Sequence, residues 1–178
     1  LADFIMYSDI LKIDEQTIDD LFERLKSYFL CDMLKISFNE LKFRQLIDLQ
    51  TKIKTVNDMI FVPLEVVHDL KQKDVLQLSA FDCLRFALHS KDELERITNL
   101  FKTIEYKPTA DEVKAGINTI SHGFFGTVDW YARRMGITNH DEVVELKWTR
   151  IYECLKRDFY NNKFERNYRK VIEQNNKK

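Results

Sequence analysis

Glu65 and His68 have the spacing in this sequence that comes closest to a catalytic or metal-binding pattern. A Glu-x-x-His pair places a carboxylate and an imidazole on one face of a helix, as in the di-iron sites of helical bundles. Such a site needs a second pair, but the residues three positions before His89, His122 and His140 are Phe, Thr and Ile. The sequence therefore predicts no metal site, and we interpret Glu65 and His68 as part of a solvated helix face.

Other catalytic and cofactor signatures are absent from the sequence. It contains no His-Glu-x-x-His zinc motif, and the segment 123–126 (Gly-Phe-Phe-Gly) lacks the glycine pattern and the lysine of a phosphate-binding loop. The three cysteines, Cys31, Cys83 and Cys154, lie far apart among apolar residues, which predicts buried free thiols in a reducing compartment. We expect no catalytic residue, no cofactor and no enzymatic activity; a Cys/His pair assembled in space is the alternative.

The segment 130–138 (Trp-Tyr-Ala-Arg-Arg-Met-Gly-Ile-Thr) resembles the first helix and the turn of a helix-turn-helix. Ala132 is followed four positions later by Gly136, with apolar residues around them. The next helix departs from the pattern, because its exposed face would hold Asp141, Glu142 and Glu145, which repel phosphate. We interpret the segment as a packing motif and keep a DNA-associated protein, regulatory or packaged with the genome, as the alternative function.

The C-terminal segment 147–178 is the basic part of the chain. It carries ten Lys and Arg and four Asp and Glu, whereas the whole chain has a formal net charge of −1. Its large apolar residues form two offset stripes on a predicted helix. The first stripe is Trp148, Ile151, Tyr152, Leu155 and Phe159, and the second is Tyr160, Phe164, Tyr168 and Val171. A straight helix cannot bury both stripes in one small domain, so we predict that the first joins the core and the second faces a partner.

The predicted partner-binding residues are Tyr160, Phe164, Arg166, Tyr168 and Arg169. Desolvation of the aromatic rings would provide binding energy, and the arginines would provide orientation and on-rate. Two alternatives stay open: the helix packs in the core with a solvated basic face, or its basic and aromatic residues bind single-stranded nucleic acid. The balanced charge of the whole chain makes nucleic acid the less favoured partner.

The scarcity of glycine and proline predicts the fold class. Four Gly and two Pro in 178 residues are too few for the many turns of a β-fold, and the 22 aromatic residues exclude a disordered chain. We predict an all-α fold, an irregular multi-helix bundle of seven to nine helices, with a short strand at 59–62 as the one exception considered. No apolar run approaches the roughly 20 residues of a membrane span.

Capping-box patterns predict where helices begin. The segments 37–40, 90–93 and 109–112 each combine a Ser or Thr with a Glu three residues later. We expect helices over 15–35, 38–60, 79–89 and 90–104, the second of them with an apolar stripe from Leu46 to Ile60. Pro63 is placed in the first turn of a helix that restarts after residue 62.

All four glycines lie between 116 and 136, which predicts a module of short helices at 110–146. Gly123 and Gly136 are placed at the ends of helices over 110–122 and 126–135, and Thr138 caps a helix over 139–146. A long terminal helix begins at Trp148. The predicted core of the module is Phe124, Trp130, Tyr131, Met135, Ile137 and Trp148.

Pro108 marks the predicted domain boundary, because it disfavours helix at the residue before it. The N-terminal domain, 1–107, is a helical bundle, and the C-terminal domain, 108–178, is the Gly-containing module with the long helix. One continuous domain is the alternative.

The stretch from Ala115 to Val171 resembles the C-terminal part of small helical proteins encoded in the structural gene clusters of tailed bacteriophages. The similar features are a short helix that ends in 122–126 (His-Gly-Phe-Phe-Gly), the segment 128–138 (Val-Asp-Trp-Tyr-Ala-Arg-Arg-Met-Gly-Ile-Thr) and an acidic helix at 140–143. The segment 146–152 (Leu-Lys-Trp-Thr-Arg-Ile-Tyr) follows, and then a long charged helix with 164–169 (Phe-Glu-Arg-Asn-Tyr-Arg). The resemblance covers about a third of the chain and implies no fixed site residues.

Such phage proteins are tail-assembly chaperones or components of the neck and tail. The resemblance implies a non-enzymatic morphogenesis protein that binds other phage structural or tail proteins. A homo-oligomer formed through the second stripe is the alternative, and the lack of a long apolar run predicts no membrane partner. It also implies a location in the host cytoplasm during assembly, with the virion as the alternative.

Overall fold

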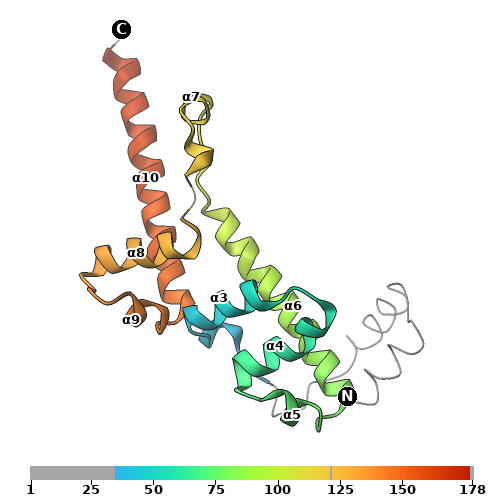
Figure 1. Cartoon of the computed structure of the whole chain (residues 1–178). Helices are drawn as coiled ribbons and strands as arrows, with labels where there is room; N and C mark the ends of the chain where they lie inside the picture. Colours follow the sequence, from blue (N-terminus) through green and yellow to red (C-terminus); the bar gives the residue numbers. More distant parts are fainter. Residues whose placement is uncertain (1–34, 121, 177–178) are drawn as a thin grey trace. The chain divides into compact units, whose positions relative to one another are not determined.

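The structure is a computed structural model that describes residues 35–120 and 122–176 (Figure 1). Eight α-helices, two 3-10 turns and no strand occur in these residues, which confirms the predicted all-α fold. None of the described helices is both long enough and apolar enough to cross a membrane. The predicted helix over 15–35 and Cys31 lie outside the described residues. The chain forms two compact units that divide between Ile97 and Thr98.

The first unit is built from short helices and most of one long helix. Its described elements are η2 (Phe38–Glu40), α3 (Phe43–Lys52), α4 (Val56–His68), α5 (Gln72–Val75) and α6 (Ala80–Thr103), whose last turns belong to the second unit. Phe38, Leu64 and Phe86 are at most 1% exposed, and the rings of Phe38 and Phe86 lie 6.4 Å apart. The side chain of Gln45 donates to the carbonyl of Val66 at 2.8 Å, which joins α3 to α4.

The helix predicted over 38–60 is wrong, because it is interrupted before Val56. The Thr55 hydroxyl accepts from the N–H of Asp58 at 3.2 Å, and the Asp58 carboxylate accepts from the N–H of Thr55 at 2.8 Å. This capping box starts α4 and changes the direction of the chain. Val56 is therefore 56% exposed, although Leu49 and Ile60 of the same stripe are buried. The strand considered at 59–62 is helical as part of α4.

Two serines predicted to begin helices do not cap one. α6 runs through Ser90 without a break, and the Ser90 hydroxyl donates to the carbonyl of Phe86 at 2.8 Å. Ser37 precedes only the turn η2, and its side chain makes no cap there. Pro63 lies inside α4 and not in a first turn. Buried residues on both sides of Ser90, such as Leu88 and Ile97, favour one long helix over two capped ones.

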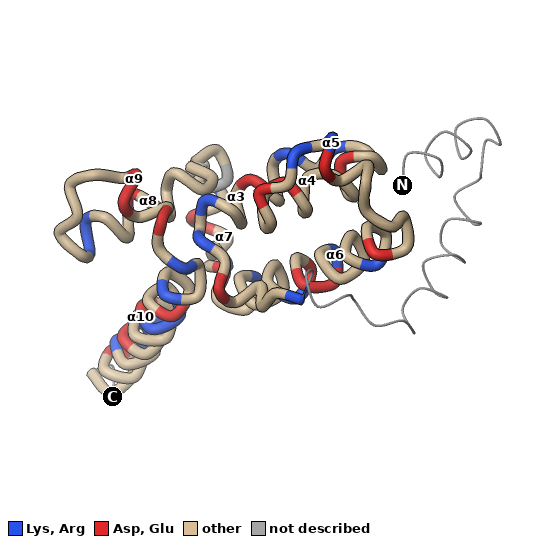
Figure 2. Tube along the Cα trace, turned by 90° about the horizontal axis from the view of Figure 1, so that it is seen from below, with Lys and Arg blue, Asp and Glu red and all other residues tan. Residues whose placement is uncertain are grey.

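The second unit contains the end of α6, α7 (Ala110–Lys114), η3 (Ile117–Thr119), α8 (Gly123–Met135), α9 (His140–Val144) and α10 (Trp148–Asn176). Basic and acidic residues alternate along much of α10 (Figure 2). The buried residues of the second unit come from α8, α9 and α10: Val128, Tyr131, Ala132, Val143, Trp148, Ile151 and Tyr152. Phe101 of α6 packs on Trp148 and Tyr152, with ring centroids 6.0 and 5.3 Å apart.

The predicted core of the Gly-containing module is only partly correct. Tyr131 and Trp148 are buried, but Phe124, Trp130 and Ile137 are half-buried. Met135 is 43% exposed because it is the last residue of α8, where the chain turns away. The turn is made by Gly136, whose φ of 67° ends the helix as predicted.

The short helices differ in their limits from the prediction. The helix expected over 110–122 is α7 followed by η3, and Gly123 begins α8 instead of ending a helix. The capping box of Thr109 and Glu112 is confirmed. α9 is capped by Asn139, whose side chain accepts from the backbone of Asp141 at 2.9 Å, and not by Thr138. The domain boundary predicted at Pro108 stays a prediction.

Candidate functional site

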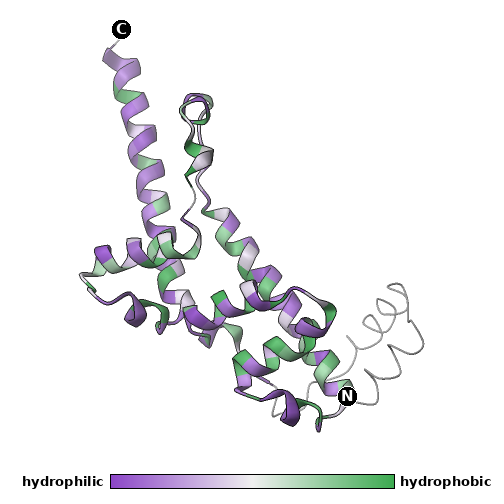
Figure 3. Ribbon diagram, in the orientation of Figure 1, coloured by the Kyte–Doolittle hydropathy of each residue, from purple (hydrophilic) through white to green (hydrophobic). Residues whose placement is uncertain are grey.

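The environment of α10 changes at Phe159. Trp148, Ile151 and Tyr152 are buried, and Phe159 is half-buried. In contrast, every residue from 160 to 176 is exposed, although apolar residues continue among the polar ones (Figure 3). The first three residues of the first predicted stripe thus enter the core, Leu155 and Phe159 are half-buried, and the second stripe lies on the surface.

Three exposed rings form what we call the aromatic face of α10: Tyr160, Phe164 and Tyr168. They are 53%, 67% and 57% exposed, and Val171 and Ile172 continue the apolar surface toward the C-terminus. The rings of Phe164 and Tyr168 stack, with centroids 6.0 Å apart and planes 7° apart. The rings recur at every turn of the helix, and exposed aromatic side chains of this kind are typical anchors of protein–protein contacts.

The two predicted arginines do not flank the aromatic face. At 3.6 residues per turn, Arg166 lies about 160° and Arg169 about 140° around the helix from Phe164. The guanidinium of Arg166 instead covers the ring of Tyr106, with 4.7 Å from its central carbon to the ring centroid. Arg169 lies 3.9 Å from Glu165 in an exposed ion pair. The structure therefore brings together three of the five predicted residues.

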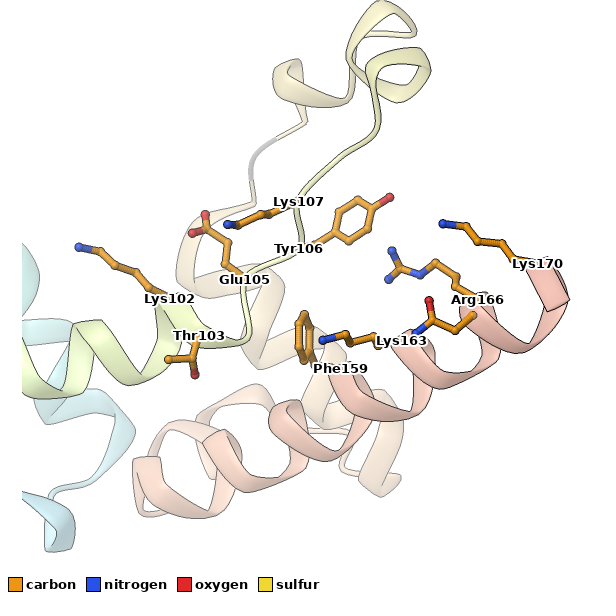
Figure 4. Close-up of a pocket in the computed structure, with 10 residues that line it drawn as sticks. Lys102, Thr103, Glu105, Tyr106, Lys107, Phe159, Lys163, Arg166 and Lys170 are labelled. Carbon is orange, nitrogen blue, oxygen red and sulfur yellow. The ribbon is translucent and has the colours of Figure 1, made fainter.

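Arg166 lines a second feature, which we call the basic pocket (Figure 4). The pocket has a volume of about 470 Å³ and lies between the end of α6 with the following residues 105–107 and the exposed half of α10. Five cations line it: Lys102, Lys107, Lys163, Arg166 and Lys170. The one carboxylate in its wall is Glu105. The charge around the pocket is therefore strongly positive.

Hydrogen bonds to Glu112 fix the position of Tyr106 at the edge of this pocket. The Tyr106 hydroxyl donates to the Glu112 carboxylate, which also accepts from the Thr109 N–H at 2.8 Å and its hydroxyl at 2.9 Å. These hydrogen bonds hold the pKa of Glu112 below its usual 4.5, and the bond from Tyr106 has the largest effect. The bond to Glu112 also raises the pKa of Tyr106 above its usual 10.0. The ring that faces Arg166 is thus held by a charged partner.

The two arginines of the segment that resembles a helix-turn-helix are each paired with a carboxylate. The Nε of Arg133 lies 3.0 Å from Asp129, and Arg134 donates to Asp158 of α10 at 2.6 Å. α9 has five residues, and its first turn contains two carboxylates. A recognition helix needs an exposed face that tolerates phosphate and reaches base edges. The segment therefore packs against α10, with Arg134 of α8 bound to Asp158.

The Glu-x-x-His pair of α4 does not form a pair of ligands. Glu65 is exposed, whereas Nε2 of His68 is buried and finds no hydrogen-bond partner in the described part of the chain. The His68 ring lies 4.9 Å from that of Phe86, and burial lowers the pKa of His68 below its usual 6.5. No group of three or more metal-ligating side chains occurs within 35–120 and 122–176. His68 is half-buried and packs on Phe86, so it is not part of the solvated face that its spacing suggested.

The linker half of the basic pocket was missed by sequence reasoning. The spacing of Lys163, Arg166 and Lys170 places them on one helix face, and this signal is visible in the sequence. Lys102 and Lys107 flank Tyr106 but are far from α10 along the chain. The packing of Phe101 on Trp148 and Tyr152 and the contact of Arg166 with Tyr106 bring the two stretches together.

Comparison with known proteins identifies no relative. No protein-family model, curated protein sequence or solved structure matches this chain. The resemblance of Ala115–Val171 to phage structural proteins therefore stays a prediction.

Proposed function

We propose that this chain is a non-enzymatic protein of bacteriophage morphogenesis that acts in tail or neck assembly by binding another protein through the aromatic face of α10. One observation supports the binding role above all: three aromatic rings are exposed on one face of a helix whose other half is core. The phage context is supported by the resemblance of residues 115–171 alone.

The proposed occupant of the aromatic face is a second protein with an apolar groove and an acidic rim. The exposed half of α10 carries four cations, Lys163, Arg166, Arg169 and Lys170, against two carboxylates, Glu165 and Glu173. In a symmetric dimer two helix ends that each carry this excess of positive charge would repel one another. An acidic rim would instead attract this end of the helix and increase the rate of encounter.

The DNA-associated alternative is not supported by the helix-turn-helix-like segment. Arg133 and Arg134 are held in ion pairs with carboxylates, and the first turn of α9 is acidic. Base reading by this segment would require both arginines to leave those partners.

The proposal is tested by removing the aromatic face from the full chain. The proteins encoded by neighbouring genes are co-expressed with the chain one at a time, and stable complexes are measured by size-exclusion chromatography with light scattering. We expect a complex with a structural protein that is lost when the chain is ended after Asn161 and weakened at least about tenfold by Phe164→Ala.

A matched control is available in α8. Phe125 is 62% exposed, close to the value for Phe164, and Phe125→Ala should leave the complex intact. Unfolding of the chain that ends at Asn161 would show that the second stripe belongs to the fold. Dimerisation of the chain alone through Phe164 would replace the acidic partner with a second copy.

A further inference from the structure

We propose that the basic pocket binds single-stranded nucleic acid, with phosphates along the cations of α10 and one base in the pocket. The proposal uses a different face of α10 from the aromatic face and does not rest on the protein-binding function.

The first argument is the uncompensated charge of the pocket. Lys102, Lys107, Lys163 and Lys170 form no ion pair within the residues that the structure describes. The close partner of Arg166 is the ring of Tyr106, and its charge also helps to lower the pKa of Glu112. Five cations around the single carboxylate of Glu105 repel one another, so an anion between them is stabilised by several charges at once.

The second argument is the arrangement of the cations on α10. Lys163, Arg166 and Lys170 follow one another at three and four residues, which gives steps of about 4.5 and 6 Å along the helix axis. All three reach toward the linker side of the pocket (Figure 4). A row of charges along one line suits a chain of phosphates better than a single compact anion.

The third argument is the presence of aromatic surface beside the charge. The pocket volume of about 470 Å³ lies within the range of roughly 300–1,000 Å³ that holds small-molecule-sized groups, and a nucleotide is such a group. Phe159 lies at the base of the pocket next to Lys163 (Figure 4). Its ring offers a stacking surface for a base, and the amide of Asn167 offers both a donor and an acceptor to a base edge.

An acidic peptide is the competing ligand for the same charges. The planar fork of arginine matches both carboxylate and phosphate, and lysine is a point charge that attracts either anion, so the flat ring of a base decides between the two ligands. Four of the five cations in the pocket are lysines, and the single arginine is stacked on Tyr106. Every nucleotide carries a flat base that can stack on Phe159, whereas an acidic peptide has no such ring at each residue. The pocket therefore favours the nucleotide.

The test measures fluorescence anisotropy of a labelled oligothymidylate of about 12 nucleotides with the full chain, within the usual site sizes for single strands. We expect the logarithm of the association constant to fall linearly with the logarithm of the salt concentration. The slope should be about −2 to −3, which corresponds to three or four phosphate contacts. The double variant K163E/K170E should bind at least about tenfold more weakly.

A matched control lies on the same helix. Arg150 and Arg157 are exposed, are also seven residues apart and lie on the opposite side of α10, so R150E/R157E makes the same change of charge away from the pocket. This variant should lose less than about threefold in affinity. Circular dichroism of both double variants checks that the helix content is kept.

Four results would overturn the proposal. They are no binding at low salt, an equal loss in both double variants, displacement of the strand by polyglutamate as effectively as by unlabelled oligothymidylate, and displacement by free thymidine triphosphate at equal affinity. The third result would assign the pocket to an acidic peptide, and the fourth to a free nucleotide. Phe164→Ala should leave strand binding unchanged, which separates this test from that of the aromatic face.

Discussion

The two halves of α10 have similar residue types but different surroundings. Trp148, Ile151 and Tyr152 lie in the core, whereas Tyr160, Phe164 and Tyr168 repeat at a similar helical spacing on an open surface. Helical periodicity shows which side chains share a face, but another element must be present to cover that face. Phe101 packs on the first half and Arg134 of α8 pairs with Asp158 there, whereas the exposed second half is where function is proposed.

The largest expected effect is the difference in stability between the two halves. Trp148→Ala removes a ring that is 1% exposed and in contact with Phe101, so it should lower the free energy of unfolding by about 3–5 kcal/mol. Phe164→Ala should change it by less than about 0.5 kcal/mol. Urea unfolding of both variants measures the contrast, and similar values for the two would refute it.

The loss of stability in Trp130→Ala is expected to lie between those of Trp148→Ala and Phe164→Ala. Trp130 is half-buried, packs on Tyr131 with centroids 6.1 Å apart and lies under the guanidinium of Arg134 at 5.7 Å. Trp130→Ala should therefore cost about 1–2 kcal/mol, less than a full core truncation. A loss equal to that of Trp148→Ala in the same urea experiment would place Trp130 in the core after all.

Breaking an ion pair should also cost more stability in the buried half of α10 than in the exposed half, but the difference should be smaller. Asp158 pairs with Arg134 and joins the buried half of α10 to α8, with both side chains less than a third exposed. Asp158→Asn should cost about 0.5–1 kcal/mol. Glu165→Gln breaks the exposed pair with Arg169 and should have no measurable effect on the thermal midpoint.

A local pH dependence is expected beside the exposed half. The pKa of Glu112 is lowered by its bond from Tyr106, so the carboxylate stabilises the folded state above its usual 4.5. This contribution is lost as the pH falls through the lowered pKa, because protonation then breaks the bonds it accepts. An NMR titration should find the Glu112 pKa below 4.5 and closer to 4.5 in Tyr106→Phe.

The sequence predicts the helical fold and the division of α10, because both follow from local composition and periodicity. It fails at Thr55 and Ser90 for opposite reasons. At Thr55 an Asp three residues later completes a capping box within an apparently continuous apolar stripe. At Ser90 a good capping pattern is overridden because burial on both sides favours an uninterrupted helix.

The basic pocket could be predicted only in part. The three cations of α10 share a face by spacing alone, but Tyr106 and the lysines around it reach them through tertiary packing. The placement of Arg166 also required the structure. Its position beside the aromatic residues in the sequence suggested a flank of the aromatic face, but two residues along a helix correspond to nearly half a turn.

The continuity of α10 has a consequence for how a partner would be bound. Starting an isolated helix is the unfavourable step, with a nucleation constant on the order of 0.001, whereas extending an existing helix is nearly neutral. Trp148 and Ile151 hold the first turns in the core, so the exposed segment extends a helix that is already formed, over about 25 Å. Backbone amide exchange should accordingly quicken steadily from Ile151 toward Asn176. A binding partner would meet rings already set in register and would not have to order a coil.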